Sequence, residues 1–232
     1  MKLFKLFTIC AAVASSALFA EEAVENVFIS QDFENPAFFE KVSPSGYTAR
    51  NAQTGQWGLF KAEKVVSITN EQAASGEYCL KYIAKKPTPY FAFVVLPTPL
   101  SDSFEFEFYM NTPQKARFTV GLVTETNGKK ERNLSFGSFD NNNNLAYLDF
   151  KAGKWKRSGI KFPFDEWVLC KMKYDKAAKN ISYYVVLNDK EEKVGEINLD
   201  APIEKVVFVE FRHNISPDGS VLYVDDVKIV KK

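Results

Sequence analysis

The stretch WVLCKMKYDKAAKNISYYVVL, residues 167–187, decides the fold. It contains two runs in which apolar and polar residues alternate, WVLCKMKY and ISYYVVL, with a polar segment between them. In the first run Cys170, Met172 and Tyr174 fall in phase. Successive side chains of a β-strand point to opposite faces, so a period of two predicts half-buried strands. This stretch therefore predicts two strands and no helix.

Runs of this kind recur along almost the whole chain. Fourteen candidate strands are separated by Gly, Pro, Asn and Asp, as in NNNN at 141–144 and SPDG at 216–219. The runs are VFISQDF, QWGLF, KVVSIT, YCLKYI, YFAFVVL, SFEFEFYM, ARFTVGLV, LSFGSF, LAYLDF, WVLCKMKY, ISYYVVL, KVGEINL, KVVFVEF and VLYVDDVKI. Only residues 70–75 could form a helical connector, so we expect an all-β protein, a large antiparallel two-sheet β-sandwich.

The N-terminal residues predict export. Residues 1–20, MKLFKLFTICAAVASSALFA, place Lys2 and Lys5 before an apolar run and small residues, which is typical of a secretory signal peptide. The apolar run is too short for a comfortable membrane span. We expect residues 21–232 to fold as a single domain. Because the lysine-led signal looks bacterial, we expect a secreted or periplasmic protein.

The charge balance limits the classes of binding partner, and the cysteine content limits the possible disulfides. Without the two lysines of the signal peptide, 28 basic side chains face 29 acidic ones. Such a balance argues against general binding to nucleic acid or to an anionic membrane. Cys79 and Cys170 could form a disulfide in an exported protein, although their different phases would place them in different layers. That question stays open at the level of sequence.

The order of the runs resembles a known family, the concanavalin A-like, laminin-G-like jelly roll. The Trp-strand-Tyr-Asp block followed by another strand is the most typical feature, and the first and last features also resemble the edges of jelly-roll carbohydrate-binding modules. The features are QDFEN at 31–35, ASGEYCLKY at 74–82, LDFKAGKW at 148–155, FDEWVLCKMKYDKAAKNISYYV at 164–185 and YVDDVKI at 223–229. The resemblance implies a jelly-roll sandwich that binds carbohydrate.

Two adjacent carboxylates interrupt the last run, VLYVDDVKIV, residues 221–230. Aspartate is depleted in strands because it competes for backbone hydrogen bonds. Regular alternation puts Asp225 on the face of Val227 and Ile229, and Asp226 on the other face. We therefore expect Asp225 to point inward, where a lone carboxylate must be neutralised.

The resemblance implies how that charge is neutralised. In similar jelly rolls a structural calcium joins the N-terminal strand to the C-terminal strand. Here the ion would use Glu34 and Asp225, with Asp32 or Asp226 helping, and calcium prefers such oxygen ligands. The alternative is that Asp225 accepts hydrogen bonds from a neighbouring loop and that no metal is bound.

A sugar-contacting segment is suggested by DFKAGKWKRSG, residues 149–159. It resembles the Tyr-Phe-Lys-Ala-Gly-x-Tyr motif of alginate-lyase-like jelly rolls, in which the second tyrosine transfers a proton. Trp155 stands at that position, and an indole N–H cannot act as an acid or base near neutral pH. Lys151, Trp155 and Arg157 could instead form an aromatic plate with cations around it. The alternative is a hairpin whose tryptophan covers a sheet edge and whose lysines are solvated.

Candidate acids and bases lie elsewhere. In SFEFEFYM, residues 103–110, Glu105, Glu107 and Tyr109 share one face. The pattern resembles the Glu-x-Asp-x-Glu strand of jelly-roll glucanases but departs from it at two positions, so we expect a solvated outer face. His213 is the only histidine, and without clustered ligands it makes a poor metal site.

We therefore predict a noncatalytic, secreted carbohydrate-binding protein with one structural calcium. Trp57, Trp155 and Tyr147 are the predicted stacking residues, and Lys151 and Arg157 the predicted polar contacts. Two alternatives stay open. One is a polysaccharide lyase or glycoside hydrolase that uses the acids and bases named above. The other is an envelope or matrix protein whose sheet face binds another envelope protein.

Overall fold

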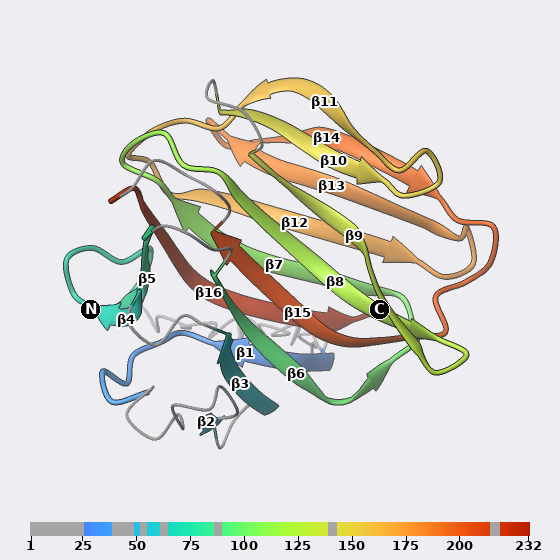
Figure 1. The fold of residues 1–232 in the computed structure, drawn as a ribbon, viewed down its shortest axis with the longest axis horizontal. Coiled ribbons are helices and arrows are strands. Elements are labelled where there is room, and N and C mark those ends of the chain that lie inside the picture. Colours follow the sequence, from blue (N-terminus) through green and yellow to red (C-terminus); the bar gives the residue numbers. More distant parts are fainter. Residues whose placement is uncertain are drawn as a thin grey trace, which may run out of the picture.

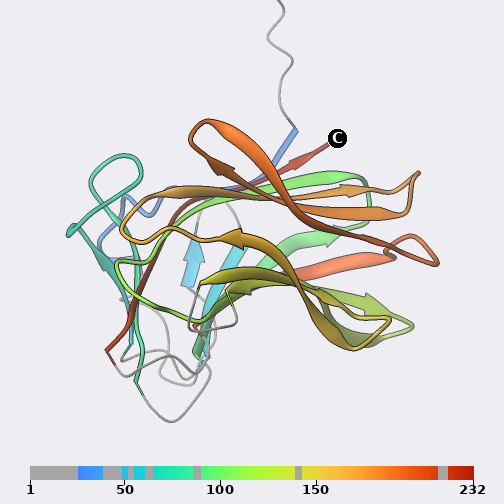
Figure 2. The same ribbon diagram turned by 90° about the horizontal axis from the view of Figure 1, so that it is seen from above.

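The computed structural model describes residues 26–38, 49–51, 55–60, 65–85, 90–138, 143–213 and 219–232. These residues form β-strands joined by turns and loops, with no helix among them. The strands form two antiparallel sheets that stack as layers (Figures 1 and 2). The predicted antiparallel β-sandwich is thus confirmed. The predicted signal peptide, residues 1–20, lies outside the described residues.

Sheet A contains the first and last described strands. Its order is β14-β13-β12-β7-β16-β5-β4, and β1 pairs with β16. The bounds are β1 Asn26–Gln31, β4 Val66–Thr69, β5 Cys79–Ile83, β7 Phe104–Asn111, β12 Val168–Asp175, β13 Asn180–Leu187, β14 Lys190–Asn198 and β16 Val221–Lys231. Residues 167–187, the stretch that predicted the fold, form β12 and β13. These two strands pair antiparallel and lie between β14 and β7 in the sheet.

Sheet B has the order β11-β10-β9-β8-β15-β6-β3-β2. The bounds are β2 Ala49–Asn51, β3 Gly55–Phe60, β6 Tyr90–Leu100, β8 Phe118–Thr126, β9 Lys129–Ser138, β10 Asn144–Asp149, β11 Lys154–Lys161 and β15 Lys205–His213. Four consecutive strands, β8 to β11, form a meander. The β8–β9 turn uses Asn127 and Gly128, both with positive φ (51° and 77°), which is the geometry of a tight hairpin.

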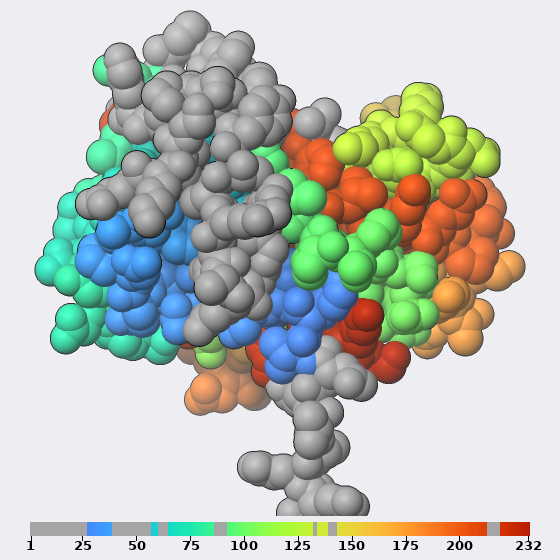
Figure 3. Space-filling view, turned by 90° about the horizontal axis from the view of Figure 1, so that it is seen from below, coloured from blue at the N-terminus to red at the C-terminus, as the bar shows by residue number. Residues whose placement is uncertain are grey.

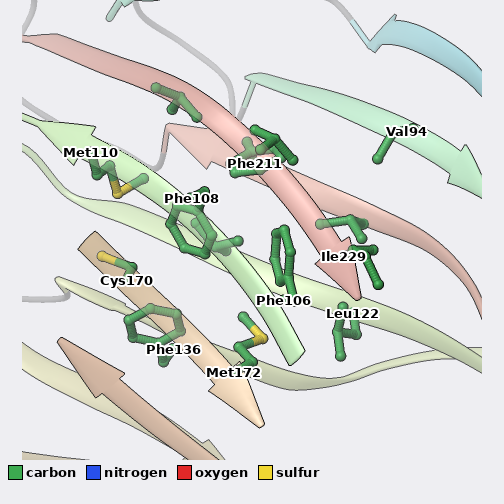
Figure 4. Packing of buried hydrophobic residues seen from close by; sticks show 14 of the residues in the cluster. Val94, Phe106, Phe108, Met110, Leu122, Phe136, Cys170, Met172, Phe211 and Ile229 are labelled. Atoms are coloured by element: carbon green, nitrogen blue, oxygen red, sulfur yellow. The ribbon is translucent and has the colours of Figure 1, made fainter. Parts of the chain in front are cut away.

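The core lies between the two sheets and is rich in aromatic side chains. On β7, Phe106 and Phe108 are fully buried, and Phe108 meets Phe211 of β15 edge to face at a centroid distance of 5.4 Å. Met172 of β12 packs in the same cluster (Figure 4). Burying one such side chain stabilises the fold by about 1.5–3 kcal/mol. The apolar residues of each alternating run thus point into the core between the two sheets.

Two sequence-based expectations are decided by the fold. Cys170 lies on the inner face of β12 in the core, whereas Cys79 donates its thiol proton to the carbonyl of Gln72 in the β4–β5 loop. Both cysteines are free, so no disulfide joins them. Residues 70–75 form bends without helix, and the predicted helical connector is therefore wrong.

Candidate functional site

Five residues form one row across the outer face of sheet B. Backbone pairing connects, from β15 to β11, Arg212, Thr119, Gly137, Ala146 and Arg157. Neighbours of the first four in sequence, Phe211, Phe118, Phe136 and Leu145, are buried in the core, so those four positions face outward, and Arg157 shares their face because it pairs with Ala146. Four strand spacings separate the backbones of Arg212 and Arg157, which is about 19 Å.

A second row runs beside the first. It includes Glu210, Gly121 and Ser135, which pair in that order, and Trp155 of β11, two positions before Arg157. A Cβ at Gly121 would lie 2.4 Å from Oγ of Ser135, so the serine side chain covers the glycine. We call the two rows together the outer patch.

Glu210 and Arg212 form the best-defined contact of the outer patch. Nε and Nη2 of Arg212 both lie 3.0 Å from Oε2 of Glu210, and the glutamate is 3% exposed. Thr119 and Ala146 are also buried. A ligand would therefore meet the half-buried side chains of Arg212, Ser135 and Trp155 and the exposed side chain of Arg157.

Trp155 and Arg157 were predicted as ligand contacts, and the structure brings them to one face. Trp155 pairs with Leu148 and is half-buried, whereas Arg157 pairs with Ala146 and is exposed. Both stand on β11, the edge strand of sheet B. Their strand was not among the predicted ones, because KWKRSGIK has no regular apolar alternation. Lysine-rich edges are common because they prevent edge-to-edge pairing.

Tyr147 does not lie on the outer patch. Its ring lies near Tyr183 of sheet A, at a centroid distance of 6.0 Å, and across Gly195, where a Cβ would come within 2.1 Å of Cε1. Figure 1 shows β10 and β14 together at this end of the sandwich. The structure thus places Tyr147, a predicted stacking residue, with its half-buried ring directed inward between the sheets.

Trp57 is also an inward residue. It is fully buried on β3, and its ring contacts those of Phe33, Phe38 and Phe211 at centroid distances of 5.3, 5.9 and 6.1 Å. The structure thus places Trp57, a predicted stacking residue, inside the core. Its role is to fill the core, and the alternating sequence QWGLF could equally have placed it on either face.

Lys151 lies in the β10–β11 turn, away from the outer patch rows. Its Nζ lies 2.6 Å from Oδ1 of Asp200. On the same hairpin, Nζ of Lys156 lies 2.7 Å from Oδ2 of Asp149, and this hydrogen bond lowers the pKa of Asp149. Exposed pairs of this kind contribute little to stability, typically about 0–1 kcal/mol. The Lys156–Asp149 pair links the two strands of the β10–β11 hairpin.

A separate cluster of carboxylates holds the β4–β5 loop. The buried carboxylate of Asp225 accepts hydrogen bonds from the backbone N–H groups of Ala74 (2.8 Å) and Ser75 (3.3 Å) through Oδ2, and of Asp226 (2.9 Å) through Oδ1. Burial raises the pKa of Asp225 to about 6. These are the loop hydrogen bonds that the alternative to a calcium ligand expected, and the amides satisfy the buried carboxylate.

The direction of Asp225 differs from the prediction because the strand contains a bulge. Asp226 has a positive φ of 46°, and the pairing of β16 with β7 shifts register between Asp225 and Lys228. Val224 and Val227 both face the core, so Asp225 faces the outer side of sheet A, beneath the loop. Regular alternation predicted the wrong face, since a bulge adds one residue to the strand.

Glu34 holds the other end of the same loop. Its carboxylate accepts hydrogen bonds from the backbone N–H groups of Glu77 (3.0 Å) and Tyr78 (3.1 Å). A Cβ at Gly76 would lie 2.3 Å from Oε1, and Gly76 has a φ of 60°, so a glycine is required there. In Figure 3 the N-terminal segment (blue) lies beside this loop segment (teal), which these contacts explain.

The predicted metal ligands Glu34, Asp225 and Asp226 thus gather around one loop. Burial is the first cause that raises the pKa of Asp226, and the charges of Asp32 and Glu34 raise it further, so negative charge accumulates there. Within the described ranges, however, no group of three or more His, Cys, Asp or Glu residues has the arrangement of a metal site. Both oxygens of Asp225 already accept N–H groups. Both oxygens of Glu34 accept N–H groups too, and Oδ1 of Asp226 accepts the hydroxyl of Ser75, so a cation here would share these oxygens with existing hydrogen bonds.

Three of the four candidate acids and bases share one face, and the fourth belongs to the other sheet. Glu105 and Glu107 lie on the outer face of sheet A, where Nζ of Lys171 is 3.7 Å from Glu105 and 2.8 Å from Glu107. Tyr109 follows them on the same face, next to Asp225 of β16. His213 belongs to β15, in the other sheet. The histidine therefore belongs to a different sheet from the two glutamates and the tyrosine.

Sequence reasoning missed Glu210 and Arg212. The run KVVFVEFRH shows that both residues lie on the polar face of a strand. Nothing in the sequence indicates that this strand lies four positions from β11, because the two are separated in the chain by β12, β13 and β14. The long-range pairing creates the patch. Within the described residues no helix is long and apolar enough to cross a membrane.

No protein-family model matches the sequence, and no curated protein matches it either. Solved structures share its fold. A sialidase aligns with a TM-score of 0.54 and 13% identity over 76% of this chain, which spans only 17% of the sialidase. Lectin II from Ulex europaeus aligns with a TM-score of 0.51 and 9% identity, covering 75% of this chain and 97% of the lectin. The exoplasmic/lumenal domain of VIP36, in its Ca2+/Man3GlcNAc-bound form, gives a TM-score of 0.50 and 9% identity over 76% and 83% of the two chains.

Proposed function

We propose that the protein is a secreted or periplasmic, noncatalytic carbohydrate-binding β-sandwich of the concanavalin A-like fold, and that the outer patch is its ligand site. The observation that carries this proposal is the row that connects Arg212 to Arg157 across five strands, with Trp155 beside it. The fold shared with a plant lectin supports the proposal.

The chemistry of the outer patch suits a sugar. The indole of Trp155 can stack on a pyranose ring, which contributes about 1 kcal/mol beyond the burial of area. Ser135 offers a hydroxyl, and Arg157 and Arg212 offer fixed N–H donors that match hydroxyl and carboxylate oxygens. A few contacts of this size support a dissociation constant that is about micromolar or weaker.

We propose further that calcium stabilises the β4–β5 loop through Glu34 and Asp226. Both carboxylates lie beside the loop, and their mutual repulsion would be relieved by a divalent cation. Asp225 would then support the ion indirectly, by holding the backbone of Ala74 and Ser75. The ion would supply positive charge at the junction of the N-terminal and C-terminal segments.

The experiment is calorimetric titration of the mature protein with a panel of neutral and acidic polysaccharides. We expect at least one glycan to bind, and Trp155→Ala to weaken that binding at least tenfold. The matched control is Trp167→Ala, because Trp167 contacts Tyr223 on the other sheet. If Trp167→Ala weakens binding and Trp155→Ala does not, the ligand site is misplaced.

Other results would favour the two alternatives. New reducing ends or unsaturated products released from any polysaccharide would indicate an enzyme. A stable complex with another envelope protein, combined with no glycan binding, would replace the proposal with protein recognition.

A further inference from the structure

The outer face of sheet A carries an aromatic pair beside the β4–β5 loop. The rings of Trp167, which directly precedes β12, and Tyr223 of β16 lie with their centroids 6.4 Å apart. Val168 and Val224, their neighbours in sequence, are buried in the core, so the two aromatic side chains face outward. Tyr223 is buried and Trp167 is half-buried, so the indole is the ring that a ligand can reach.

A carboxylate lies next to this pair. The hydroxyl of Tyr223 donates to Oε2 of Glu71, 2.9 Å away, and Oε1 of Glu71 accepts a hydrogen bond from Lys81. Burial, followed by the hydrogen bond to Glu71, raises the pKa of Tyr223 to about 12, so the phenol keeps its proton. Glu71 is exposed, and each carboxylate oxygen has two lone pairs. Both oxygens can therefore accept a further donor from a ligand.

Asn111 forms the floor of the same region. It pairs with Tyr223, and the register of β7 with β12 brings Trp167 to its other side. Its Nδ2 donates to Oε1 of Gln72 (3.4 Å), whereas its buried Oδ1 accepts no hydrogen bond in the part of the chain that the structure describes. A buried acceptor without a donor costs free energy, which a ligand hydroxyl would recover. We call Trp167, Tyr223, Asn111, Glu71 and Gln72 the loop site.

The β4–β5 loop holds Glu71 and Gln72 over the sheet. The thiol of Cys79 donates to the carbonyl of Gln72 over 2.8 Å, and Asp225 accepts the backbone N–H of Ala74, also over 2.8 Å. Groups that are fixed before a ligand arrives lose less conformational entropy on binding. The loop contacts thus prepare the acceptors of the loop site.

The polar groups that the loop site keeps open are mainly acceptors. They are the two oxygens of Glu71 and Oδ1 of Asn111, and Lys81, the cation beside them, is already in an ion pair with Glu71. A neutral sugar ring matches this set, because its face stacks on an indole and its hydroxyl groups donate.

We infer that the loop site binds a neutral sugar ring and gives the protein a second carbohydrate site. The inference goes beyond the proposed function and rests on it. The sugar stacks on Trp167 while its hydroxyl groups donate to Glu71 and to Oδ1 of Asn111. Because this Oδ1 is buried, a hydroxyl reaches it only after a small movement of side chains, which makes the loop site weaker than a fully open one.

The two sites point in opposite directions. Sheets A and B lie on opposite sides of the core (Figure 2), with the loop site on the outer face of one and the outer patch on the outer face of the other. One protein can then bridge two glycan chains.

An organic ammonium ion is the competing ligand for aromatic rings beside a carboxylate. The chain already supplies a cation there, since Nζ of Lys81 lies 5.8 Å from the centroid of the Tyr223 ring and pairs with Glu71. A further cation would have to displace it. The loop site therefore favours a neutral ligand.

The test removes each exposed tryptophan in turn. The mature protein, Trp155→Ala, Trp167→Ala and the double variant are titrated calorimetrically with neutral oligosaccharides of glucose, galactose, mannose and xylose. We expect Trp155→Ala to lose the tighter class of site and keep a weaker one, which the double variant weakens at least a further tenfold. Trp167→Ala alone should leave the affinity of the outer patch unchanged. Tyr184→Ala is the matched control, because this half-buried ring shares the face but lies under Nζ of Lys173, 4.6 Å from its centroid.

Polar variants in the Trp155→Ala background test the acceptors. Asn111→Leu should weaken sugar binding about fivefold, the loss of one modest hydrogen bond, without lowering the melting temperature. Glu71→Gln keeps an acceptor and removes the charge, so it should change sugar binding less than threefold and weaken any binding of tetramethylammonium at least tenfold. Turbidity of the bound polysaccharides should appear with the unmodified protein and vanish in either single tryptophan variant.

The results separate the inference from the function on which it rests. One site per protein, with all binding lost in Trp155→Ala, overturns the loop site and leaves the proposed function standing. Binding that depends on Trp167 alone supports the loop site and overturns the placement of the ligand on the outer patch. No binding of any glycan overturns both. Binding of tetramethylammonium without any neutral sugar, lost in Glu71→Gln, overturns the assignment to sugar.

Discussion

Asp225 holds the backbone of Ala74, a residue 151 positions earlier in the chain, through a hydrogen bond of 2.8 Å to Oδ2. This contact closes the β4–β5 loop over the outer side of sheet A. It also explains the paired aspartates of β16. Asp226 takes the positive φ that the bulge needs, a conformation that Asp tolerates better than most residues, and the bulge turns Asp225 toward the loop.

The first prediction concerns that loop. Asp225→Ala removes the acceptor of the Ala74 and Ser75 amides, so the loop should open locally without unfolding the sheets. We expect hydrogen exchange at these two amides to accelerate at least about tenfold, which corresponds to the loss of one modest hydrogen bond. Asp200→Ala, at an exposed carboxylate, is the control and should leave both amides protected. Unchanged exchange in Asp225→Ala would show that the loop is held by other contacts.

The second prediction concerns calcium. A ligand that binds only the folded state raises its stability, by about 2.7 kcal/mol at a hundredfold excess over the dissociation constant. We expect millimolar calcium to raise the melting temperature of the mature protein and a chelator to reverse the change. Asp226→Asn should abolish this response and still fold, because asparagine also accepts positive φ. A full calcium response in Asp226→Asn would exclude this residue as a ligand.

The third prediction separates two glycines of the outer patch. A Cβ at Gly137 would lie 2.1 Å from the backbone oxygen of Phe118, which cannot move without breaking the sheet pairing. At Gly121 the Cβ meets the rotatable hydroxyl of Ser135. We expect Gly137→Ala to lower the free energy of unfolding by at least about 2 kcal/mol and Gly121→Ala by less than about 1 kcal/mol. Urea unfolding measures both, and equal losses would contradict the packing described.

The fold could be predicted from sequence because apolar alternation is a local signal. Each of the fourteen expected runs contributes to a strand, including WVLCKMKY and ISYYVVL, which form β12 and β13. β11 was missed because an exposed edge strand needs no apolar face. The site was harder to predict, since alternation does not say which face is inward. The alternation in QWGLF and LAYLDF does not show whether Trp57 and Tyr147 face a ligand or the core. In the structure both rings pack between the sheets.

The bulge at Asp226 shows the same limit within one strand. The period of two is preserved on either side of the bulge, but the face to which a given position points changes there. Within YVDDVKI, only the two aspartates indicate that the strand is irregular. Pairing partners are equally hidden. Arg212 and Arg157 share a row because four strands of the meander and β15 align, and that register is set by contacts across the whole sheet.

The last prediction distinguishes Trp57 from Trp155, which were both predicted from the sequence to stack on a sugar. Trp57→Ala would leave a cavity among Phe33, Phe38 and Phe211, and we expect it to lower the free energy of unfolding by about 3–5 kcal/mol. Trp155 is half-buried on an edge strand, so Trp155→Ala should cost about 1 kcal/mol or less while it removes glycan binding. Urea unfolding and calorimetric titration of the same two variants measure both effects. Trp57→Phe refills part of the cavity, and it should recover part of the lost stability and bind glycan as the unmodified protein does. Loss of glycan binding in a stably folded Trp57→Phe would instead place the ligand near β3.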